Sequence, residues 1–114
     1  MGGSKAFREK NGVASKLNKR RIEPMNKEIA TKFEEVVYNH FYYFFVRMLG
    51  RDASVESQRE WMHKSNQANK QLIALGELYG HDFLHKYMYQ SYKGYKIADR
   101  AKQAAREYLE GYTN

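Results

Sequence analysis

The sequence predicts an all-α fold, a compact bundle of three to five helices that follows an extended basic N-terminal arm. Three observations lead to this prediction. Apolar residues in the body recur at the three- and four-residue spacing of an amphipathic helix. The connections between these apolar stretches are short, which favours antiparallel neighbours in a bundle. The positive charge is concentrated near the N-terminus, where apolar residues are too sparse to cover a core face.

Length and composition limit the organisation to one folded domain. The chain has 114 residues and no cysteine, which excludes disulfides and thiolate metal sites and is typical of a reducing compartment. No apolar run reaches the roughly 20 residues of a membrane span, and the polar, Gly-rich start does not resemble a secretory signal. We expect an arm, residues 1–25, a helical domain, residues 26–114, and an intracellular location in the cytoplasm, a nucleoid or a packaged particle.

The first helix of the body is predicted to begin at Asn26, a possible N-cap, and to stop at Gly50. Between these two residues the apolar side chains follow helical spacing. They are Ile29, Phe33, Val36, Val37, Phe41, Phe44 and Met48.

A second helix is predicted to follow, capped by Asp52 or Ser54 and running toward Gly80. Its strongest apolar part lies within residues 72–79, whereas residues 63–71 are nearly all polar. Two alternatives stay open for this polar stretch: a helix solvated all round, or a break between two shorter helices.

A third helix is predicted after Gly80, with Asp82 as its cap. Gly94 costs about 1 kcal/mol in a helix interior, so this helix either stops there or passes through with a bend. The last segment, residues 95–110, contains alanines that let another helix come close, and Gly111 is predicted to end it.

The arm is the first candidate binding element. With Lys27, it carries eight basic residues against Glu9 and Glu23, a net charge of +6 out of +7 for the whole chain. Charge concentrated in this way favours a polyanionic partner, nucleic acid above all, with a solubilising tail or a transport signal as alternatives. The predicted contacts are Lys5, Arg8, Lys10, Lys16, Lys19, Arg20 and Arg21.

A second candidate is a stripe of cations that forms if one helix continues through Gly94. Spacings of three and four residues would then place five side chains on one face, where the cations could follow a phosphate backbone and the tyrosine could stack on a base. The alternative is a solvated helix face. The stripe consists of Lys86, Tyr89, Lys93, Lys96 and Arg100.

The aromatic block of residues 40–46 points in every direction around a helix, so no single core face can bury all of it. Either the helix is central and surrounded by the others, or the block forms a protein interface. For the second case we expect Tyr42, Tyr43 and Phe45 to face a partner or a second copy. Trp61 is predicted to be a core or hinge anchor rather than a base-stacking platform.

Catalytic signatures are weak. His81 and His85 share one helix face, and Gly80-His81-Asp82 resembles the His-Asp doublet of helical HD-type phosphohydrolases. That resemblance implies a metal site completed by an upstream His and a downstream Asp, for which this chain offers His63 and Asp99; the pattern that flanks the doublet in that family is absent. We find no phosphate-binding loop or nucleophile elbow and expect no catalytic residue, no metal, no cofactor and no small-molecule substrate.

The sequence therefore predicts a non-enzymatic helical protein whose arm engages nucleic acid, DNA or RNA, and whose aromatic-rich body docks on protein in a larger assembly. An alternative is an inhibitor or adaptor that acts purely by binding a larger, nucleic-acid-handling protein, of a host-takeover or anti-defence type. A membrane-surface protein is a third possibility. It rests on the basic arm and on a start that partly resembles an N-myristoylation signal, although Ala6 stands where that signal has Ser or Thr.

Overall fold

The computed structural model describes residues 27–113 of the chain. These residues form four helices and no strand, so the predicted all-α class is confirmed for this range. The predicted arm and the predicted cap Asn26 lie outside the described residues. The helices are α2 (Lys27–Leu49), α3 (Val55–Tyr79), α4 (His81–Tyr89) and α5 (Tyr92–Thr113).

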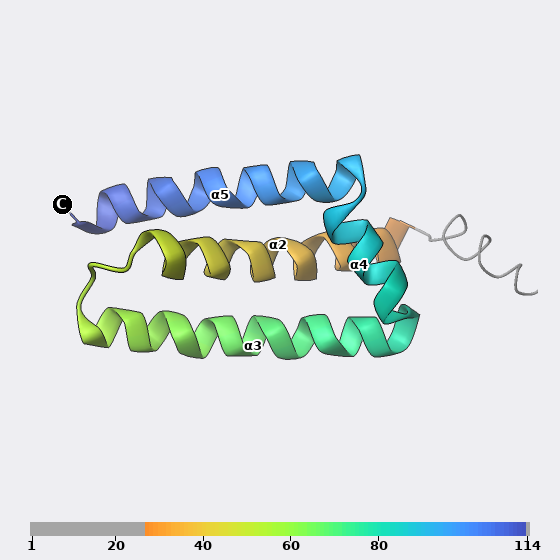
Figure 1. Ribbon diagram of the computed structural model, residues 1–114, viewed down its shortest axis with the longest axis horizontal. Coiled ribbons are helices and arrows are strands. Elements are labelled where there is room, and N and C mark those ends of the chain that lie inside the picture. Colours follow the sequence, from red (N-terminus) through yellow and green to blue (C-terminus); the bar gives the residue numbers. More distant parts are fainter. Residues whose placement is uncertain (1–26, 114) are drawn as a thin grey trace, which may run out of the picture. The chain divides into compact units, whose positions relative to one another are not determined.

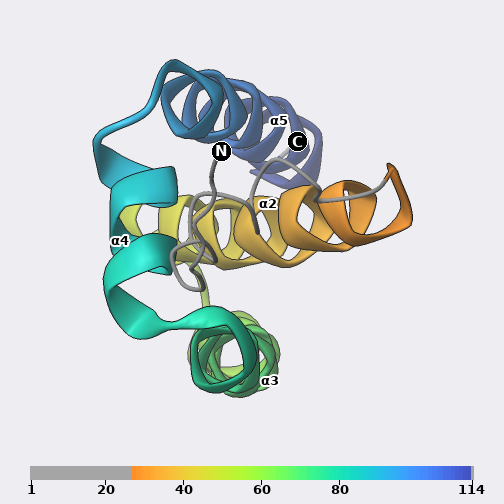
Figure 2. The ribbon, with the colours of Figure 1, turned by 90° about the vertical axis from the view of Figure 1, so that its right-hand side faces the viewer.

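The chain divides into two units, Met1–Lys32 and Phe33–Asn114. Within the second unit, α2 lies between α3 and α5, and the short α4 links the end of α3 to the start of α5 (Figures 1 and 2). The short turn after α2 makes α3 its antiparallel neighbour, as the short connections predicted. Because α4 carries the chain across the bundle end, α5 runs in the same direction as α2.

α2 supplies the largest apolar contribution to the core. Burial of a large apolar side chain stabilises the fold by about 1.5 to 3 kcal/mol, so this helix organises the packing. Phe44 and Met48 continue the predicted spacing but are exposed. The buried residues are Phe33, Val36, Val37, Phe41 and Val46.

α3 begins at a well-formed cap and crosses the polar stretch without a break. Ser54 is the N-cap, and its Oγ accepts a hydrogen bond from the Ser57 backbone N–H at 3.1 Å. The helix stays continuous through residues 63–71 because small side chains form its buried stripe there, with Ser65 and Ala68 both buried. The helix is therefore unbroken, and one narrow side of it faces the core.

α4 differs from its prediction at both ends. Gly80, with φ 102°, ends α3 and immediately precedes α4, and it makes no side-chain cap. A left-handed backbone of this kind favours glycine. Asp82 is therefore not the predicted cap but lies in the first turn, where a carboxylate still interacts favourably with the helix dipole. α4 then ends at Tyr89, and α5 starts at Tyr92 and continues through Gly94 and Gly111.

The core of the second unit contains an aromatic cluster near each end of α2. At one end the buried Phe33 ring lies 5.1, 5.6 and 5.3 Å from the ring centroids of Tyr79, Phe83 and Tyr87. These rings join α2 to α3 and α4.

At the other end of α2, Val46, Trp61 and Ala105 join α2, α3 and α5. The Trp61 indole Nε1–H donates to the Tyr108 hydroxyl at 3.3 Å. The prediction that Trp61 anchors the core is confirmed.

Candidate binding surfaces

The predicted cations of the arm cannot be placed, because all of them lie outside the described residues. They are Lys5, Arg8, Lys10, Lys16, Lys19, Arg20 and Arg21. Their contribution to binding stays a prediction from the sequence.

The predicted cation stripe is divided between two helices. Lys86 and Tyr89 belong to the last turn of α4, and Lys93 lies in the first turn of α5, on the far side of the joint at Gln90 and Ser91. Gly94 does not interrupt α5, so the break falls four residues earlier than the glycine suggested. The regular spacing along one helix therefore holds only for the α5 members, which are Lys93, Lys96 and Arg100.

Two of these cations meet a carboxylate of α2. Lys93 Nζ lies 3.7 Å from Glu34 Oε1, and Arg100 Nη1 lies 3.5 Å from Glu34 Oε2. The Arg100 guanidinium also lies over the Tyr38 ring, 5.1 Å from its centroid. All three charged side chains keep contact with solvent, so these ion pairs contribute little to stability. These ion pairs do hold Lys93 and Arg100 of the stripe against α2.

The Glu34 carboxylate also affects a neighbouring phenol. Burial raises the pKa of Tyr87, and the negative charge of Glu34 raises the pKa of this phenol further. Tyr87 therefore stays neutral across the physiological range.

Exposed tyrosines lie on both sides of the α4–α5 joint. Tyr92 and Tyr95 are 73% and 66% exposed, and their rings stack with centroids 6.5 Å apart. Lys96 Nζ lies 5.5 Å from the Tyr92 ring centroid, within cation–π range. Tyr89 is also exposed, with its ring edge-on to Phe41 of α2. We group the exposed residues that flank this joint under the term tyrosine-lysine surface: Lys86, Tyr89, Tyr92, Tyr95 and Lys96.

The aromatic block of α2 is largely engaged within the chain. Tyr42 and Phe45 are half-buried and pack on the cluster of Val46, Trp61 and Ala105. Burial raises the pKa of Tyr42, and the neighbouring Tyr43, Tyr108 and Tyr38 raise that pKa further.

Tyr43 is half-buried and meets the Tyr42 ring edge-on, and Lys102 lies over the Phe45 ring. Within residues 40–46, Phe44 is the exposed aromatic residue, at 47%. That Tyr42, Tyr43 and Phe45 face a partner stays a prediction.

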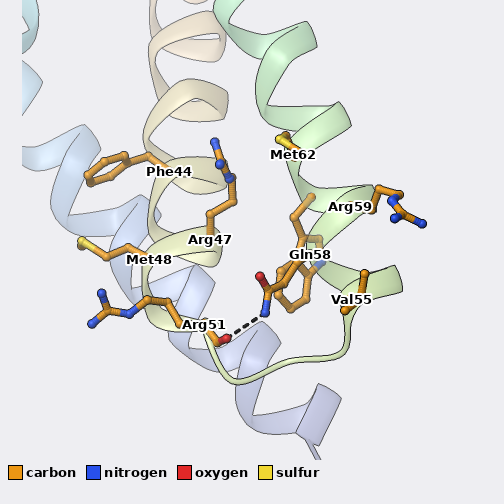
Figure 3. Close-up of a pocket in the computed structure, with 9 residues that line it drawn as sticks. Phe44, Arg47, Met48, Arg51, Val55, Gln58, Arg59 and Met62 are labelled. Carbon is orange, nitrogen blue, oxygen red and sulfur yellow. Dashed lines mark hydrogen bonds between the residues drawn. The ribbon is translucent and has the colours of Figure 1, made fainter.

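A pocket of about 630 Å³ opens where α2 ends and α3 begins (Figure 3). Its apolar lining includes side chains that are exposed to solvent, namely Phe44, Met48, Val55 and Met62. Arg47, Arg51 and Arg59 also line it. The turn that shapes it is fixed by Gln58, whose Nε2 donates to the Arg51 and Ala53 carbonyl oxygens at 2.7 and 2.8 Å. We term this feature the arginine pocket.

The histidines considered for metal binding are not gathered into a ligand set. His81 and His85 lie on α4, and the His85 ring contacts Tyr89. Within residues 27–113, no three His, Cys, Asp or Glu side chains lie close enough together to hold a metal ion. His63 and Asp99, which the resemblance to HD-type phosphohydrolases suggested as further ligands, therefore do not assemble with His81 and Asp82.

None of the helices in the described part of the chain has the length and apolar character needed to cross a bilayer.

Comparison of the chain with protein families, with curated proteins and with solved structures found no match.

Proposed function

We propose that this chain is a non-enzymatic binding protein that engages nucleic acid through its N-terminal cations and through the tyrosine-lysine surface. The observation that carries the proposal is the exposed stack of Tyr92 on Tyr95 with Lys96 over the Tyr92 ring. Large aromatic rings left in solvent beside cations offer a nucleic-acid strand both a π-face and a positive charge.

The chemistry favours a single strand over a duplex. Unpaired bases can stack on exposed tyrosines, which contributes about 1 to 3 kcal/mol per base. Paired bases cannot reach a ring without being unstacked. Lys86 and Lys96 make no ion pair with a carboxylate of residues 27–113, so they are free to contact phosphates. The cations of residues 1–25 would add contacts of the same kind, each releasing a counterion.

The second part of the proposed function is docking of the helical body on a protein. Phe44 and the apolar rim of the arginine pocket support this part, because an aromatic and methionine-rich exposed surface is typical of interface centres. Such a chain would link a nucleic-acid strand to a protein within one assembly.

The test is binding of fluorescent single-stranded DNA and RNA at several salt concentrations. We expect Tyr92→Ala with Tyr95→Ala to weaken binding by about tenfold or more, because two stacking platforms are lost. Reversal of Lys86 or of Lys96 to Glu, each as a single variant, should lower affinity and flatten the salt dependence by about 0.7 for the lost contact. Lys70→Glu, on the exposed side of α3, is the matched charge control and should change affinity least.

Deletion of residues 1–25 separates the two elements of the proposal. Residual binding that still requires Tyr92 and Tyr95 would support a role for the helical body. If binding disappears on deletion, and if replacement of both tyrosines in the full chain leaves it unchanged, the whole activity belongs to the arm. The tyrosine-lysine surface would then be removed from the proposal.

The second candidate function is an inhibitor or adaptor that acts only by binding a larger protein. The arginine pocket is the observation that favours it, since it combines exposed apolar groups with cations. Affinity for DNA and RNA no greater than that of an unrelated basic protein, together with intact protein binding, would select this candidate over the first.

A further inference from the structure

The arginine pocket combines exposed apolar groups with cations. Phe44, Met48 and Met62 present flexible or aromatic apolar groups to solvent. Methionine-rich surfaces adapt to different apolar partners because the thioether chain is unbranched and polarisable. The pocket is open rather than enclosed, and it is lined by residues of α2 and α3 and of the turn at residues 50–54 that joins them (Figure 3).

The cations of the pocket have no carboxylate partner in the part of the chain that the structure describes. Within residues 27–113, none of the guanidinium groups of Arg47, Arg51 and Arg59 forms an ion pair. Elsewhere in the same range, Lys64, Lys93 and Arg100 do meet carboxylates. Arginine keeps its charge at any physiological pH and binds carboxylates through two parallel hydrogen bonds. The pocket therefore offers three unoccupied carboxylate-binding groups around an apolar surface.

We propose that the arginine pocket binds an acidic amphipathic helix of a partner protein. The apolar face of that helix would lie on Phe44, Met48 and Met62, and its flanking Asp or Glu side chains would pair with the arginines. This inference rests on the protein-docking part of the proposed function and does not require the chain to bind nucleic acid.

The charge of each possible occupant of the pocket indicates which of them fits. The chain's own N-terminal segment carries a net +6 with Lys27 included and would bring cations against arginines. A second copy docked by the same pocket would place one set of arginines against the other, which costs free energy in a desolvated interface. A nucleic-acid strand satisfies the cations, but apart from the thymine methyl group its bases have no aliphatic group to fill the space between Met48 and Met62. An acidic helix satisfies both requirements.

The test uses the full chain and a pair of synthetic helical peptides. Both peptides carry Leu at positions i, i+3, i+4 and i+7; one has Glu at the flanking positions and the other has Lys. Fluorescence anisotropy should give at least about tenfold tighter binding of the Glu peptide. The double variant Arg47→Glu, Arg59→Glu should reverse this preference, while Lys70→Glu should retain it. Reversal of preference by the same protein excludes loss of folding as the cause.

A second measurement locates the peptide. Amide chemical shifts of the full chain should change at the end of α2 and the start of α3, and not at the tyrosine-lysine surface. Equal affinity for the two peptides, or shifts away from the pocket, would overturn the proposal. Loss of oligonucleotide or anionic-vesicle binding in Arg47→Glu, Arg59→Glu, without reversal of peptide preference, would instead assign the pocket to nucleic acid or lipid and also overturn it.

Failure of the helix-binding proposal can be told apart from failure of the nucleic-acid proposal. The variants Tyr92→Ala and Tyr95→Ala should leave the affinity for the Glu peptide within about twofold, because these residues lie on α5 outside the pocket.

Discussion

The Ser91 hydroxyl donates a hydrogen bond to the backbone carbonyl oxygen of Tyr87 at 2.6 Å. The same hydroxyl oxygen accepts a hydrogen bond from the Gly94 backbone N–H at 2.9 Å. One side chain thus satisfies a carbonyl in the last turn of α4 and an N–H in the first turn of α5. Because the joint lies within the tyrosine-lysine surface, Ser91 positions that surface.

Replacement of Ser91 by Ala removes both hydrogen bonds. We expect the free energy of unfolding to fall by about 0.5 to 2 kcal/mol, the usual cost of losing a helix cap. Ser91→Thr keeps the hydroxyl and should lose less. Urea denaturation followed by circular dichroism measures both, and equal losses for Ala and Thr would show that the hydroxyl is not the stabilising group.

Gly94 is required where α5 passes the end of α4. A Cβ built on it would come too close to the backbone carbonyl oxygens of Tyr87 and Met88. We expect Gly94→Ala to destabilise the chain by more than about 1 kcal/mol, although alanine favours a helix over glycine by about that amount. Gly111→Ala is the matched control, because nothing lies within 4 Å of its Cβ position; it should stabilise α5 or leave it unchanged. Thermal unfolding compares the two, and stabilisation by both would contradict the close contact.

His40 should make stability depend on pH. Burial lowers the pKa of His40 below the ordinary 6.5. A hydrogen bond between His40 Nδ1 and the Asn69 Oδ1 acceptor, 2.8 Å long, partly offsets this lowering. As the pH falls below about 6.5, the unfolded chain takes up a proton before the folded chain does, so the free energy of unfolding decreases. The loss levels off once folded His40 is also protonated.

Denaturation of wild type and His40→Gln at pH 8, 7, 6 and 5.5 tests this expectation. The variant should show a smaller decrease between pH 7 and 5.5 than the wild type does. An identical pH dependence in the two proteins would mean that another group is responsible.

Glu34 restrains two cations of the predicted stripe, so its neutralisation should strengthen nucleic-acid binding. In Glu34→Gln, Lys93 and Arg100 lose their ion pairs and become available to phosphates. We expect tighter binding and a steeper salt dependence, with a change in unfolding free energy below about 1 kcal/mol. The pKa of Tyr87 should fall toward its ordinary value but stay raised by burial.

The matched control is Glu35→Gln, which changes the net charge equally and leaves both ion pairs in place. An equal gain in affinity for the two variants would show that net charge matters and that release of Lys93 and Arg100 does not.

Periodicity and capping chemistry were sufficient to predict the helices that begin or end at strong signals. Ser54 and Gly80 bound α3 as predicted, because a hydroxyl cap and a left-handed glycine act locally. The continuity of α3 could not be decided from hydropathy, because the buried residues in its middle are Ser65 and Ala68. The small size of these two side chains lets neighbouring side chains approach. Size therefore determines their burial more than polarity does.

The joint between α4 and α5 was missed because glycine was expected to mark it. Ser91, a residue type that favours the N-cap position, directly precedes α5, and this is a signal that the sequence does contain. Tyr92 and Tyr95 were not among the predicted contacts, because the predicted stripe assumed one continuous helix through Gly94. The separate start of α5 at Tyr92 changes which residues lie together. The arginine pocket joins two helix ends, so no spacing along one helix reveals it.

Trp61 makes the molecule its own optical reporter. The chain has one tryptophan, and its ring lies 6.2 and 5.4 Å from the rings of Tyr108 and Tyr112. Separation of α3 from α5 would weaken energy transfer from these tyrosines and expose the indole, which shifts its emission to the red. Trp61 also lines the arginine pocket, so an occupant would alter the same emission without any attached label.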